Sequence, residues 1–362
     1  MRVAYTLEQC WHRVPGGTGV AAIEVARELA ARPDLTIVGV AGRHRRPATE
    51  GFVPPIPVSA MPLGGPLLYE TWLRFRWPKV ESVADVDIVH STTIIPPATD
   101  LPLVATIHDV AFLRHPEFFT ERGTKVFRRS LDILRERADA VLCSSVATME
   151  DCVAAGFHES RLVHVPLGVR ALEVGDPVRH EINEAYQLPA RFVLFVGTLE
   201  PRKNLPRLLD ALALVPDAPP LVVAGMRGWG EDVPRTDHDV RFIGHVPAHH
   251  LPALYEACTV FAFPSVLEGF GLPVAEAMAQ GAIVVTSRGT STEEVAGGAA
   301  HLVDPLDVES IAAGISDALA GDDAMRGAAR DRARRMSWSC TADMTVDAYR
   351  TVLDPHRERG SA

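Results

Sequence analysis

Residues 191–225 read "RFVLFVGTLEPRKNLPRLLDALALVPDAPPLVVAG" and contain one strand–helix–strand unit. An apolar run ends at Gly197, a polar loop follows, and apolar residues then recur at helical spacing before a second apolar run. Short apolar runs of this kind are typical of strands buried on both faces, and a helix between them joins parallel neighbours. The segment therefore predicts an α/β fold with parallel sheets covered by helices.

The same alternation extends in both directions along the chain. Strands are expected at 2–7, 35–42, 86–92, 102–109, 140–145 and 162–168, and again at 191–198, 219–225, 240–246, 260–265, 282–287 and 299–304. The pattern restarts after "PLGVRALEVGDP", which predicts two doubly wound, Rossmann-like domains, 1–170 and 171–336. A further helix is expected over about 337–354; its docking site is left open, and the first domain is one candidate.

Length and composition limit the class of protein. With 362 residues, of which 47% are apolar, the chain can bury two domain cores. It contains no run of 18 apolar residues, and its first residues, "MRVAYTLEQC", lack the pattern of a signal peptide, so we expect a cytoplasmic protein without a membrane span. The five cysteines form no Cys-x-x-Cys pair and are expected to be buried thiols.

Charge is unevenly distributed. Residues 1–170 contain 19 Lys and Arg and 19 Asp and Glu, so the rest of the chain carries the whole net charge of −10. A strongly acidic second half argues against a nucleic-acid groove there, and no nucleic-acid partner is expected.

Two segments have features of phosphate-binding loops. In "GGTG", Gly16 and Gly17 precede a predicted helix, whose free N–H groups attract anions, although a tight turn is the alternative. In "GTLEPRKN", Arg202 and Lys203 follow a buried strand that ends at Gly197. Two cations at the carboxyl edge of a sheet suit a diphosphate, although a solvated charge pair is the alternative.

A third segment, "PSVLEGFGLPVAEAMAQG", places two carboxylates around a helix start. Pro273 suits the first turn of that helix, so Glu268 lies in the loop before it and Glu276 about one turn inside it. Carboxylates accept hydrogen bonds from vicinal sugar hydroxyls, and a helix start between them suits phosphate. This arrangement predicts a nucleotide-sugar site. The alternative is that Glu276 only complements the helix dipole and Glu268 is solvated.

Five segments together resemble the retaining glycosyltransferases of family 4, which have the GT-B fold. In chain order they are "GGTG", "TIHDVAFLRHPEFF", "GTLEPRKN", "GHVPAHHLPALYEAC" and "PSVLEGFGLPVAEAMAQG". The last is the most specific, because it matches the family's two glutamates separated by seven residues. The resemblance spans nearly the whole chain and implies two Rossmann-like domains that face a central cleft.

The resemblance also implies roles for matching positions. Glu268 would hold the transferred sugar, His108 would reach the sugar near its 6-hydroxyl, and Arg202 and Lys203 would neutralise the departing diphosphate. From the residues alone, His108 has the alternative of an ordinary core histidine at a strand end. Positions implied to bind the donor, including Glu276 on the ribose and the backbone of Val246 beside the base, are Gly16, Gly17, Gly197, Val246, Gly269, Phe270, Gly271, Leu272 and Glu276.

Two Asp-x-Asp strings, at residues 85–87 and 237–239, raise the question of a metal ion. Both immediately precede predicted strands, so they belong to the amino edge of a sheet, away from a ligand at the carboxyl edge. We expect no metal and no other cofactor. The cations and the helix start would then stabilise the leaving group, and the resemblance implies retention at the anomeric carbon.

Donor and acceptor are less constrained. "TIHDVAFLRHPEFF" resembles the mannosyltransferase-like members, so GDP-mannose is favoured as donor, with UDP-sugars possible. A glycan or lipid-linked acceptor is expected. Aromatic and basic residues alternate at 69–79, and basic residues recur at 122–139, as in helices that lie on an anionic membrane, although a solvated basic face is the alternative.

Other functions fit the same motifs. One alternative is a different enzyme of GT-B shape, such as a sugar-nucleotide epimerase or a phosphorylase, although no lysine motif for pyridoxal phosphate is evident. Another is a non-catalytic protein that binds sugar nucleotides, which would tolerate loss of Glu268 or Arg202; both residues are present.

Overall fold

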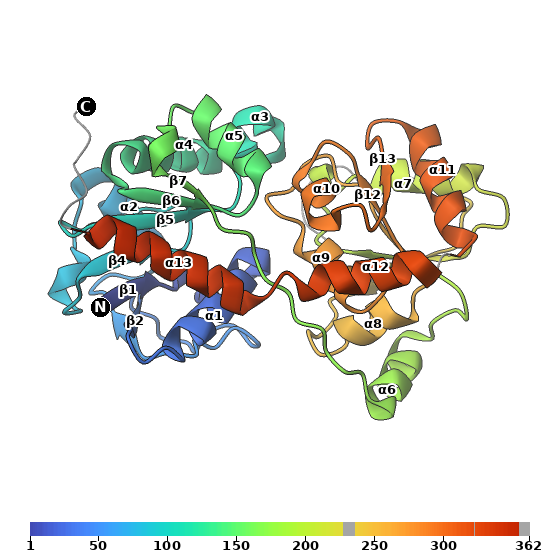
Figure 1. Ribbon diagram of the computed structural model, residues 1–362, viewed down its shortest axis with the longest axis horizontal. Helices are drawn as coiled ribbons and strands as arrows, with labels where there is room; N and C mark the ends of the chain where they lie inside the picture. Colours follow the sequence, from blue (N-terminus) through green and yellow to red (C-terminus); the bar gives the residue numbers. More distant parts are fainter. Residues whose placement is uncertain (227–235, 322, 355–362) are drawn as a thin grey trace. The chain divides into compact units, whose positions relative to one another are not determined.

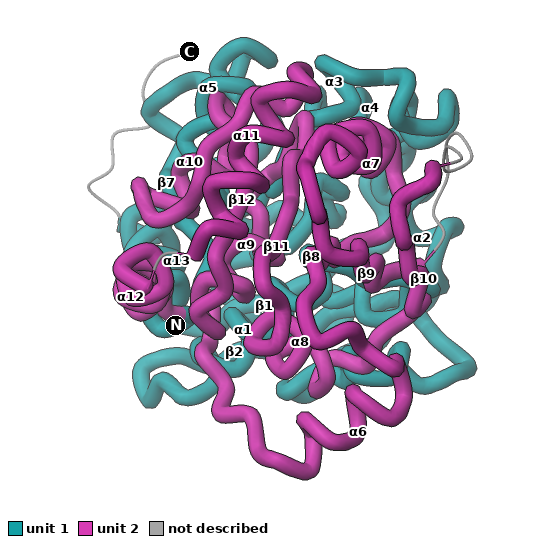
Figure 2. The backbone as a smooth tube through the Cα atoms, turned by 90° about the vertical axis from the view of Figure 1, so that its right-hand side faces the viewer, with its two compact units in different colours: residues 1–168, 338–362 teal, residues 169–337 magenta. Residues whose placement is uncertain are grey.

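The computed structural model describes residues 1–226, 236–321 and 323–354. The chain divides into two compact units, residues 1–168 with 338–362, and residues 169–337 (Figure 2). No helix among the described residues is both long and apolar enough to cross a membrane.

The first unit contains a seven-stranded parallel sheet in the order β3-β2-β1-β4-β5-β6-β7. Its strands are β1 (Arg2–Thr6), β2 (Thr36–Ala41), β3 (Val58–Ala60), β4 (Ile88–Ser91), β5 (Leu103–Ile107), β6 (Ala140–Cys143) and β7 (Leu162–His164). Its helices are α1 (Gly16–Ala30), α2 (Gly65–Phe75), α3 (Ala111–Arg114), α4 (Glu121–Arg137), α5 (Val146–Ala154) and α13 (Trp338–Leu353).

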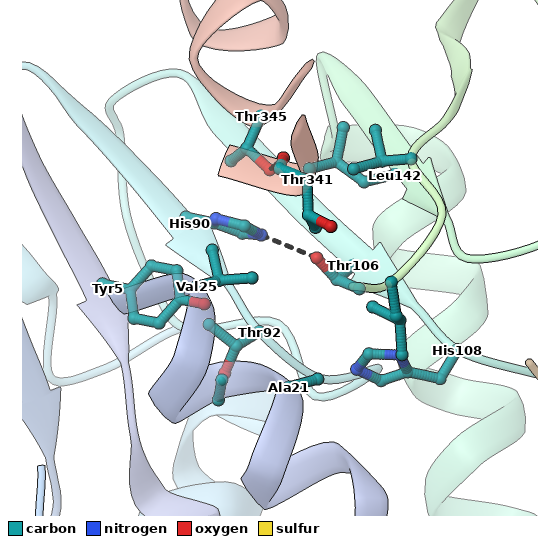
Figure 3. A pocket seen from close by; sticks show the side chains of 13 residues that line it. Tyr5, Ala21, Val25, His90, Thr92, Thr106, His108, Leu142, Thr341 and Thr345 are labelled. Atoms are coloured by element: carbon teal, nitrogen blue, oxygen red, sulfur yellow. Dashed lines mark hydrogen bonds between the residues drawn. The ribbon is translucent and has the colours of Figure 1, made fainter. Parts of the chain in front are cut away.

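Both faces of this sheet are covered, because alternate residues of each strand point to opposite faces. One set, which includes Val89 and Val141, packs with Leu134 of α4 and with residues of α2. The alternate set includes Tyr5 and His90 and faces α1 and α13 (Figure 3). Helices on both faces explain why the strands are nearly continuous apolar runs.

Helix α13 belongs to the first unit although the second unit separates it from the rest in the sequence. The Tyr349 hydroxyl lies 2.5 Å from His90 Nδ1, in the core under the sheet. The Thr341 hydroxyl donates to the Pro166 carbonyl, and Arg350 pairs with Asp34 at 2.9 Å. These contacts fix the helix beside α1 (Figure 1).

The second unit contains a six-stranded parallel sheet in the order β10-β9-β8-β11-β12-β13. Its strands are β8 (Val193–Val196), β9 (Leu221–Ala224), β10 (Val240–Gly244), β11 (Val260–Phe263), β12 (Val284–Ser287) and β13 (His301–Val303). Its helices are α6 (Asp176–Tyr186), α7 (Leu205–Leu214), α8 (Leu251–Ala257), α9 (Leu272–Ala279), α10 (Ser291–Ala296), α11 (Val308–Leu319) and α12 (Asp323–Arg334). The predicted α/β class with parallel sheets is confirmed in both units.

Two local expectations were wrong. Strand β3 was missed, because its three residues follow the proline-rich "FVPPIP" and only extend the edge of the sheet beside β2. Helix α1 begins at Gly16, so the glycines expected before the helix form its first turn. Gly19 packs so closely that a Cβ there would lie 2.6 Å from Cβ of Pro15, which explains a glycine inside the helix.

Candidate active site

The strand order of the second sheet reverses between β8 and β11. From β8 the chain continues outward through β9 and β10, and it then returns to the other side of β8 as β11. The loops that leave the carboxyl ends of β8 and β11 therefore diverge at a topological switch point, where ligands of doubly wound sheets bind. Arg202 and Lys203 follow β8, and Glu268 follows β11.

These three side chains meet in one ion-pair cluster. Lys203 Nζ donates to Glu268 Oε1 at 2.7 Å, and Arg202 Nη1 donates to Glu268 Oε2 at 2.8 Å. The side chains of Lys203 and Glu268 are each 8% exposed, so the alternatives of a solvated glutamate and a solvated charge pair are wrong. On its other side, Arg202 Nε donates to Glu200 at 2.8 Å, and Lys203 Nζ lies 4.6 Å from the centre of the Phe263 ring.

The charges are held in their ionised forms against the effect of burial. Burial raises the pKa of Glu268, but Arg202 and Lys203 outweigh it and bring that pKa down to about 2. Burial lowers the pKa of Lys203, and Glu268 opposes that shift. Glu268 is therefore ionised near neutral pH, and its ion pairs hold the side chains of Arg202 and Lys203 at fixed positions.

Backbone and neutral side chains hold the two loops in register. Asn204 has φ of +64° and its amide donates to the carbonyls of Pro264 and Pro305, so it joins three loops at the same edge. The Ser265 hydroxyl donates to Glu268 Oε1 at 3.0 Å. The motif search missed both residues. The one available signal was the Asn after "PRK", because asparagine is common in the left-handed conformation that ends such turns.

Helix α9 begins beside this cluster with a left-handed residue. Gly271 has φ of +104°, and a Cβ there would lie 2.7 Å from Thr292 Cγ2, so glycine is needed for both conformation and space. Phe270 and Leu272 on either side are buried. Gly269 follows Glu268 directly in the loop, and the Ser291 hydroxyl fixes that loop by donating to the Glu268 carbonyl at 2.7 Å.

Glu276 lies in the middle of α9 and has a different environment. Its Oε2 accepts a hydrogen bond from the Tyr255 hydroxyl of α8 at 3.0 Å. Burial raises the pKa of Glu276 to about 7, and the bond from Tyr255 opposes that rise only in part. The two glutamates of the motif therefore differ: Glu268 is a permanent carboxylate, whereas Glu276 titrates near neutral pH. Tyr255 was also missed by sequence reasoning.

Gly197 and Val246 lie at the carboxyl ends of strands in the same sheet. Gly197 directly follows β8, and its Cα faces the Lys203 side chain, since a Cβ there would lie 3.4 Å from Cε of that lysine. Val246 follows β10 and is buried. Both positions share the edge that carries Glu268, as the strand–turn–helix pattern predicted.

The remaining predicted residues belong to the first unit. His108 follows β5 and lines a cavity of about 20 Å³ together with His90, Thr92 and Thr106 (Figure 3). Burial lowers the pKa of His108, which Asp109 and the Thr92 backbone oppose only partly. The ring is therefore neutral near pH 7.

Gly16 and Gly17, at the start of α1, are exposed. Gly16 has φ of +62° and open space around its Cα, so the helix start is accessible to solvent within this unit.

The Asp-x-Asp strings lie where the sequence predicted. Asp85 and Asp87 precede β4 and both pair with Arg2, the first residue of β1, so they are at the amino edge of the first sheet. Asp239 precedes β10 and pairs with Arg241 at 3.2 Å. The carboxylates of Asp85, Asp87 and Asp239 are thus engaged in local ion pairs.

The aromatic and basic residues at 69–79 are divided between core and surface. Trp72 is buried and its indole N–H donates to the Pro78 carbonyl at 2.8 Å. Phe75 and Trp77 are exposed, whereas Arg74 pairs with Glu70 at 2.5 Å and Lys79 pairs with Asp100. Phe75 and Trp77, in the C-terminal part of the stretch, are therefore its most exposed aromatic rings, whereas Tyr69 is only partly exposed.

Comparison with protein families covers both units. Residues 15–171 match the model described as "Glycosyltransferase Family 4", and residues 179–336 match "Glycosyl transferases group 1". The chain is 32% identical over 310 residues to "O-antigen chain mannosyltransferase B" of Escherichia coli, covering 79% of this chain and 81% of that protein. It is 27% identical to "Serotype-specific mannosyltransferase WbdA" of the same organism over 74% of this chain, which spans only 36% of that longer protein.

Solved structures agree on the fold. The lipopolysaccharide glycosyltransferase WaaG superposes with a TM-score of 0.68 and 17% identity, covering 96% of this chain and 99% of that one. Anabaena HepE, solved in complex with UDP and glucose, gives a TM-score of 0.71 with 18% identity and the same coverage. The predicted family and the GT-B fold are confirmed: this chain belongs to glycosyltransferase family 4, and it is a glycosyltransferase of the mannosyltransferase-like type.

Proposed function

We propose that this glycosyltransferase moves a hexose, with mannose favoured, from a nucleoside-diphosphate sugar to a glycan or lipid-linked acceptor with retention at the anomeric carbon. The observation that carries the proposal is the buried cluster in which Glu268 bridges Arg202 and Lys203 at the switch point of the second sheet. GDP-mannose is the favoured donor, because the two Escherichia coli relatives described above are named as mannosyltransferases. A UDP-sugar is the alternative donor.

The cluster suits departure of a diphosphate. As a glycosidic bond to phosphate breaks, negative charge grows on the phosphate oxygens, and donors fixed in advance stabilise that charge without reorganisation. Arg202 and Lys203 are held in place by Glu268 and by the loop that Asn204 ties down. Gly197 and the N-terminus of α9 lie at the same edge. The glycine lets phosphate oxygens approach the backbone closely, and the helix start offers them free N–H groups.

The two glutamates take separate parts of the donor. Glu268 lies in the loop with Gly269, Phe270 and Gly271. In the proposal, it accepts hydrogen bonds from hydroxyls of the transferred sugar. Glu276 lies in α9, where it is hydrogen-bonded to Tyr255, and accepts hydrogen bonds from the ribose hydroxyls. Val246, after β10, contributes its backbone beside the base. Residues 171–336 are thus the nucleotide-sugar domain of the proposal.

The first domain, residues 1–170, takes the acceptor side. His108, neutral near pH 7 because burial lowers its pKa, is suited to hydrogen-bond a sugar hydroxyl as donor or acceptor. Gly16 and Gly17 offer the backbone of a helix start to phosphate. Helix α13, at residues 338–353, is part of this domain.

Transfer is proposed to be independent of a divalent cation. Asp85 and Asp87 pair with Arg2 at the amino edge of the first sheet, and the cations at the carboxyl edge of the second take the place of a metal at the diphosphate. The departing phosphate itself is suited to accept the proton of the attacking hydroxyl, because negative charge grows on its oxygens as the bond to the sugar breaks.

A peripheral position at the inner face of a membrane completes the proposal. Phe75 and Trp77 are exposed at the end of α2, which packs beside α4. Helix α4 adds the exposed cations Arg122, Lys125 and Arg128. Aromatic rings with neighbouring cations suit an anionic bilayer, where a lipid-linked acceptor is found.

One assay tests the core of the proposal. The protein is incubated with GDP-mannose, UDP-glucose or ADP-glucose and a mannose-terminated glycolipid, with and without EDTA, and the anomeric configuration of the product is determined by proton NMR. We expect transfer of mannose from GDP-mannose with retained configuration, at the same rate in EDTA. Inversion, or loss of turnover in EDTA that Mg²⁺ or Mn²⁺ restores, would refute the corresponding part.

A further inference from the structure

A second group of chemically active side chains lies in the second unit, apart from the ion-pair cluster of Arg202, Lys203 and Glu268. Glu181 comes from α6, and His249 and His250 immediately precede α8. One ligand atom from each of the three residues lies within 4.8 Å of the others. Two imidazoles and a carboxylate are a ligand set that divalent first-row metals such as Zn²⁺ prefer.

His250 has one ring nitrogen engaged and the other available. The residue is 5% exposed, and its Nδ1 lies 2.8 Å from the Tyr186 hydroxyl of α6. Its Nε2 is buried, and among the described residues no group forms a hydrogen bond with it. A buried nitrogen without a partner costs free energy, so the site is incomplete without a further atom at Nε2.

The Glu181 carboxylate lies close enough to His250 Nε2 for the two groups to bind one ion. Glu181 Oε1 lies 3.1 Å from Nε2 but outside the direction in which a ring N–H would donate. Two ligands of one tetrahedral zinc ion, each about 2 Å from it, lie roughly 3.3 Å apart. The separation of these two atoms therefore matches two adjacent ligands of one ion better than a hydrogen bond.

His249 supplies a third ligand. Its ring is exposed and its centre lies 4.3 Å from that of His250, so a small rotation brings a nitrogen to the same point. Tyr186 orients the His250 ring, because a partner at Nδ1 of a ligating histidine fixes the ring and leaves Nε2 for the metal.

We propose that Glu181, His249 and His250 bind one zinc-like divalent cation that clamps α6 to the start of α8. Clamping has a physical purpose here, because Ile182 is the only buried residue of α6, all of whose residues are described. The other ion pair between the two helices, Arg179 with Glu256 at 2.9 Å, is largely exposed. Such exposed pairs contribute little, so a metal bond would add substantially to the attachment that Ile182 and the Tyr186–His250 contact provide.

The test measures zinc binding directly, on full-length protein freed of any purification tag. Zinc is titrated against the metal-free protein in competition with a chromophoric chelator, and Co²⁺ is used in parallel because its visible spectrum reports tetrahedral nitrogen and oxygen ligands. We expect one zinc ion per chain at micromolar or lower concentration. Glu181→Gln and His249→Ala should each weaken binding at least tenfold, and Tyr186→Phe by about tenfold, as for a lost outer partner.

His180→Gln is the matched control. His180 lies on the same helix, is exposed and is 3.3 Å from Glu184, outside the proposed ligand set. It should bind zinc like the wild type. Equal zinc affinity in wild type and Glu181→Gln, or no stoichiometric binding, overturns the proposal.

The clamp is independent of the transfer reaction. Zinc should raise the melting temperature of the wild type and leave that of His249→Ala unchanged. Turnover of His249→Ala should match the wild type, because none of the three ligands belongs to the proposed donor site. A rise of equal size in both proteins would refute the clamp while leaving the transferase proposal untouched.

Discussion

Lys203 donates to Glu268 across 2.7 Å although 65 residues separate the two in the chain. The bond joins the loops that leave β8 and β11, and both groups are almost completely buried. The same contact therefore stabilises the fold and fixes a cation at the proposed diphosphate position. Variants that separate these two effects provide the first test.

Lys203→Met should destabilise the protein by about 3 kcal/mol, because it leaves a buried carboxylate with one partner fewer. The double variant Lys203→Met with Glu268→Met removes both charges and should recover most of that loss. Transfer should be lost in both. Thermal unfolding and initial rates check the prediction; a double variant no more stable than the single one would contradict it.

Glu276→Ala should weaken binding of the free nucleoside diphosphate by roughly 1.5–3 kcal/mol, as expected for a lost charged hydrogen bond. Glu268→Ala should reduce turnover by about 10²–10³-fold, the order seen when a polar group at the reacting centre is removed. Its effect on diphosphate affinity should be smaller than that of Glu276→Ala and should arise only from the release of Arg202 and Lys203, which Glu268 holds in place. Calorimetry with the diphosphate and initial rates with the sugar nucleotide measure the two effects.

Glu309→Ala is the control for this pair, because Glu309 is an exposed carboxylate on α11. It should change neither quantity. If Glu268→Ala and Glu276→Ala lower the affinity for the diphosphate equally, the proposed division between sugar and ribose is wrong.

The contribution of Glu276 to stability should fall as pH rises from about 4.5 to 7, because burial raises the pKa of Glu276 from 4.5 to about 7. In that window the folded protein retains a proton that the unfolded chain has released, so deprotonation favours unfolding. The shift corresponds to at most about 3 kcal/mol. Glu276→Gln should remove this contribution and melt higher than the wild type at pH 8 but not at pH 4.5. Calorimetry at pH 4.5 and pH 8 measures the two melting temperatures. An equal difference between the variant and the wild type at both pH values would exclude the effect.

Gly271→Ala should destabilise the protein by about 2–3 kcal/mol and weaken donor binding, because a Cβ would lie 2.7 Å from Thr292 Cγ2 and φ is +104°. Gly289→Ala is a matched control with positive φ, +73°, and nothing within 4 Å of the added atom. It should cost only about 1 kcal/mol of strain. Melting temperatures and donor affinities compare the two; equal losses would show that the contact with Thr292 is not the cause.

Replacing Phe75 and Trp77 by Ser should reduce sedimentation with vesicles that contain anionic lipid, and raised salt should reduce it further. Phe242→Ser is the control, because Phe242 is another exposed aromatic residue, in the second unit, and this change should have no effect. Unchanged sedimentation of the double variant would remove this face from the proposal.

The fold class was predictable because buried parallel strands are short apolar runs, and such runs can be recognised in the local sequence without knowledge of their partners. Strand β3 was not predictable, since its pairing with β2 depends on the neighbouring strand and not on its own residues. Glu268 and Glu276 were found because a motif of fixed spacing carries them. Ser265, Asn204 and Tyr255 were missed because each acts through a contact with a distant segment, which no local pattern records.

Electrostatic differences between the two glutamates were also outside the reach of sequence. The same residue type has its pKa lowered to about 2 at position 268 and raised to about 7 at position 276. Burial raises the pKa of both carboxylates, but two cations outweigh it at Glu268, whereas at Glu276 the Tyr255 hydroxyl opposes it only in part.

The return of α13 to the first unit has a consequence for the order in which this protein folds during synthesis. The ribosome completes residues 169–337 before it produces the Tyr349 that contacts His90 in the core of the first sheet. Until then, the face of that sheet beside α1 lacks its second helix. We therefore expect the second unit to reach its native form first on the emerging chain, and the first unit to close only when residues 338–353 have been made.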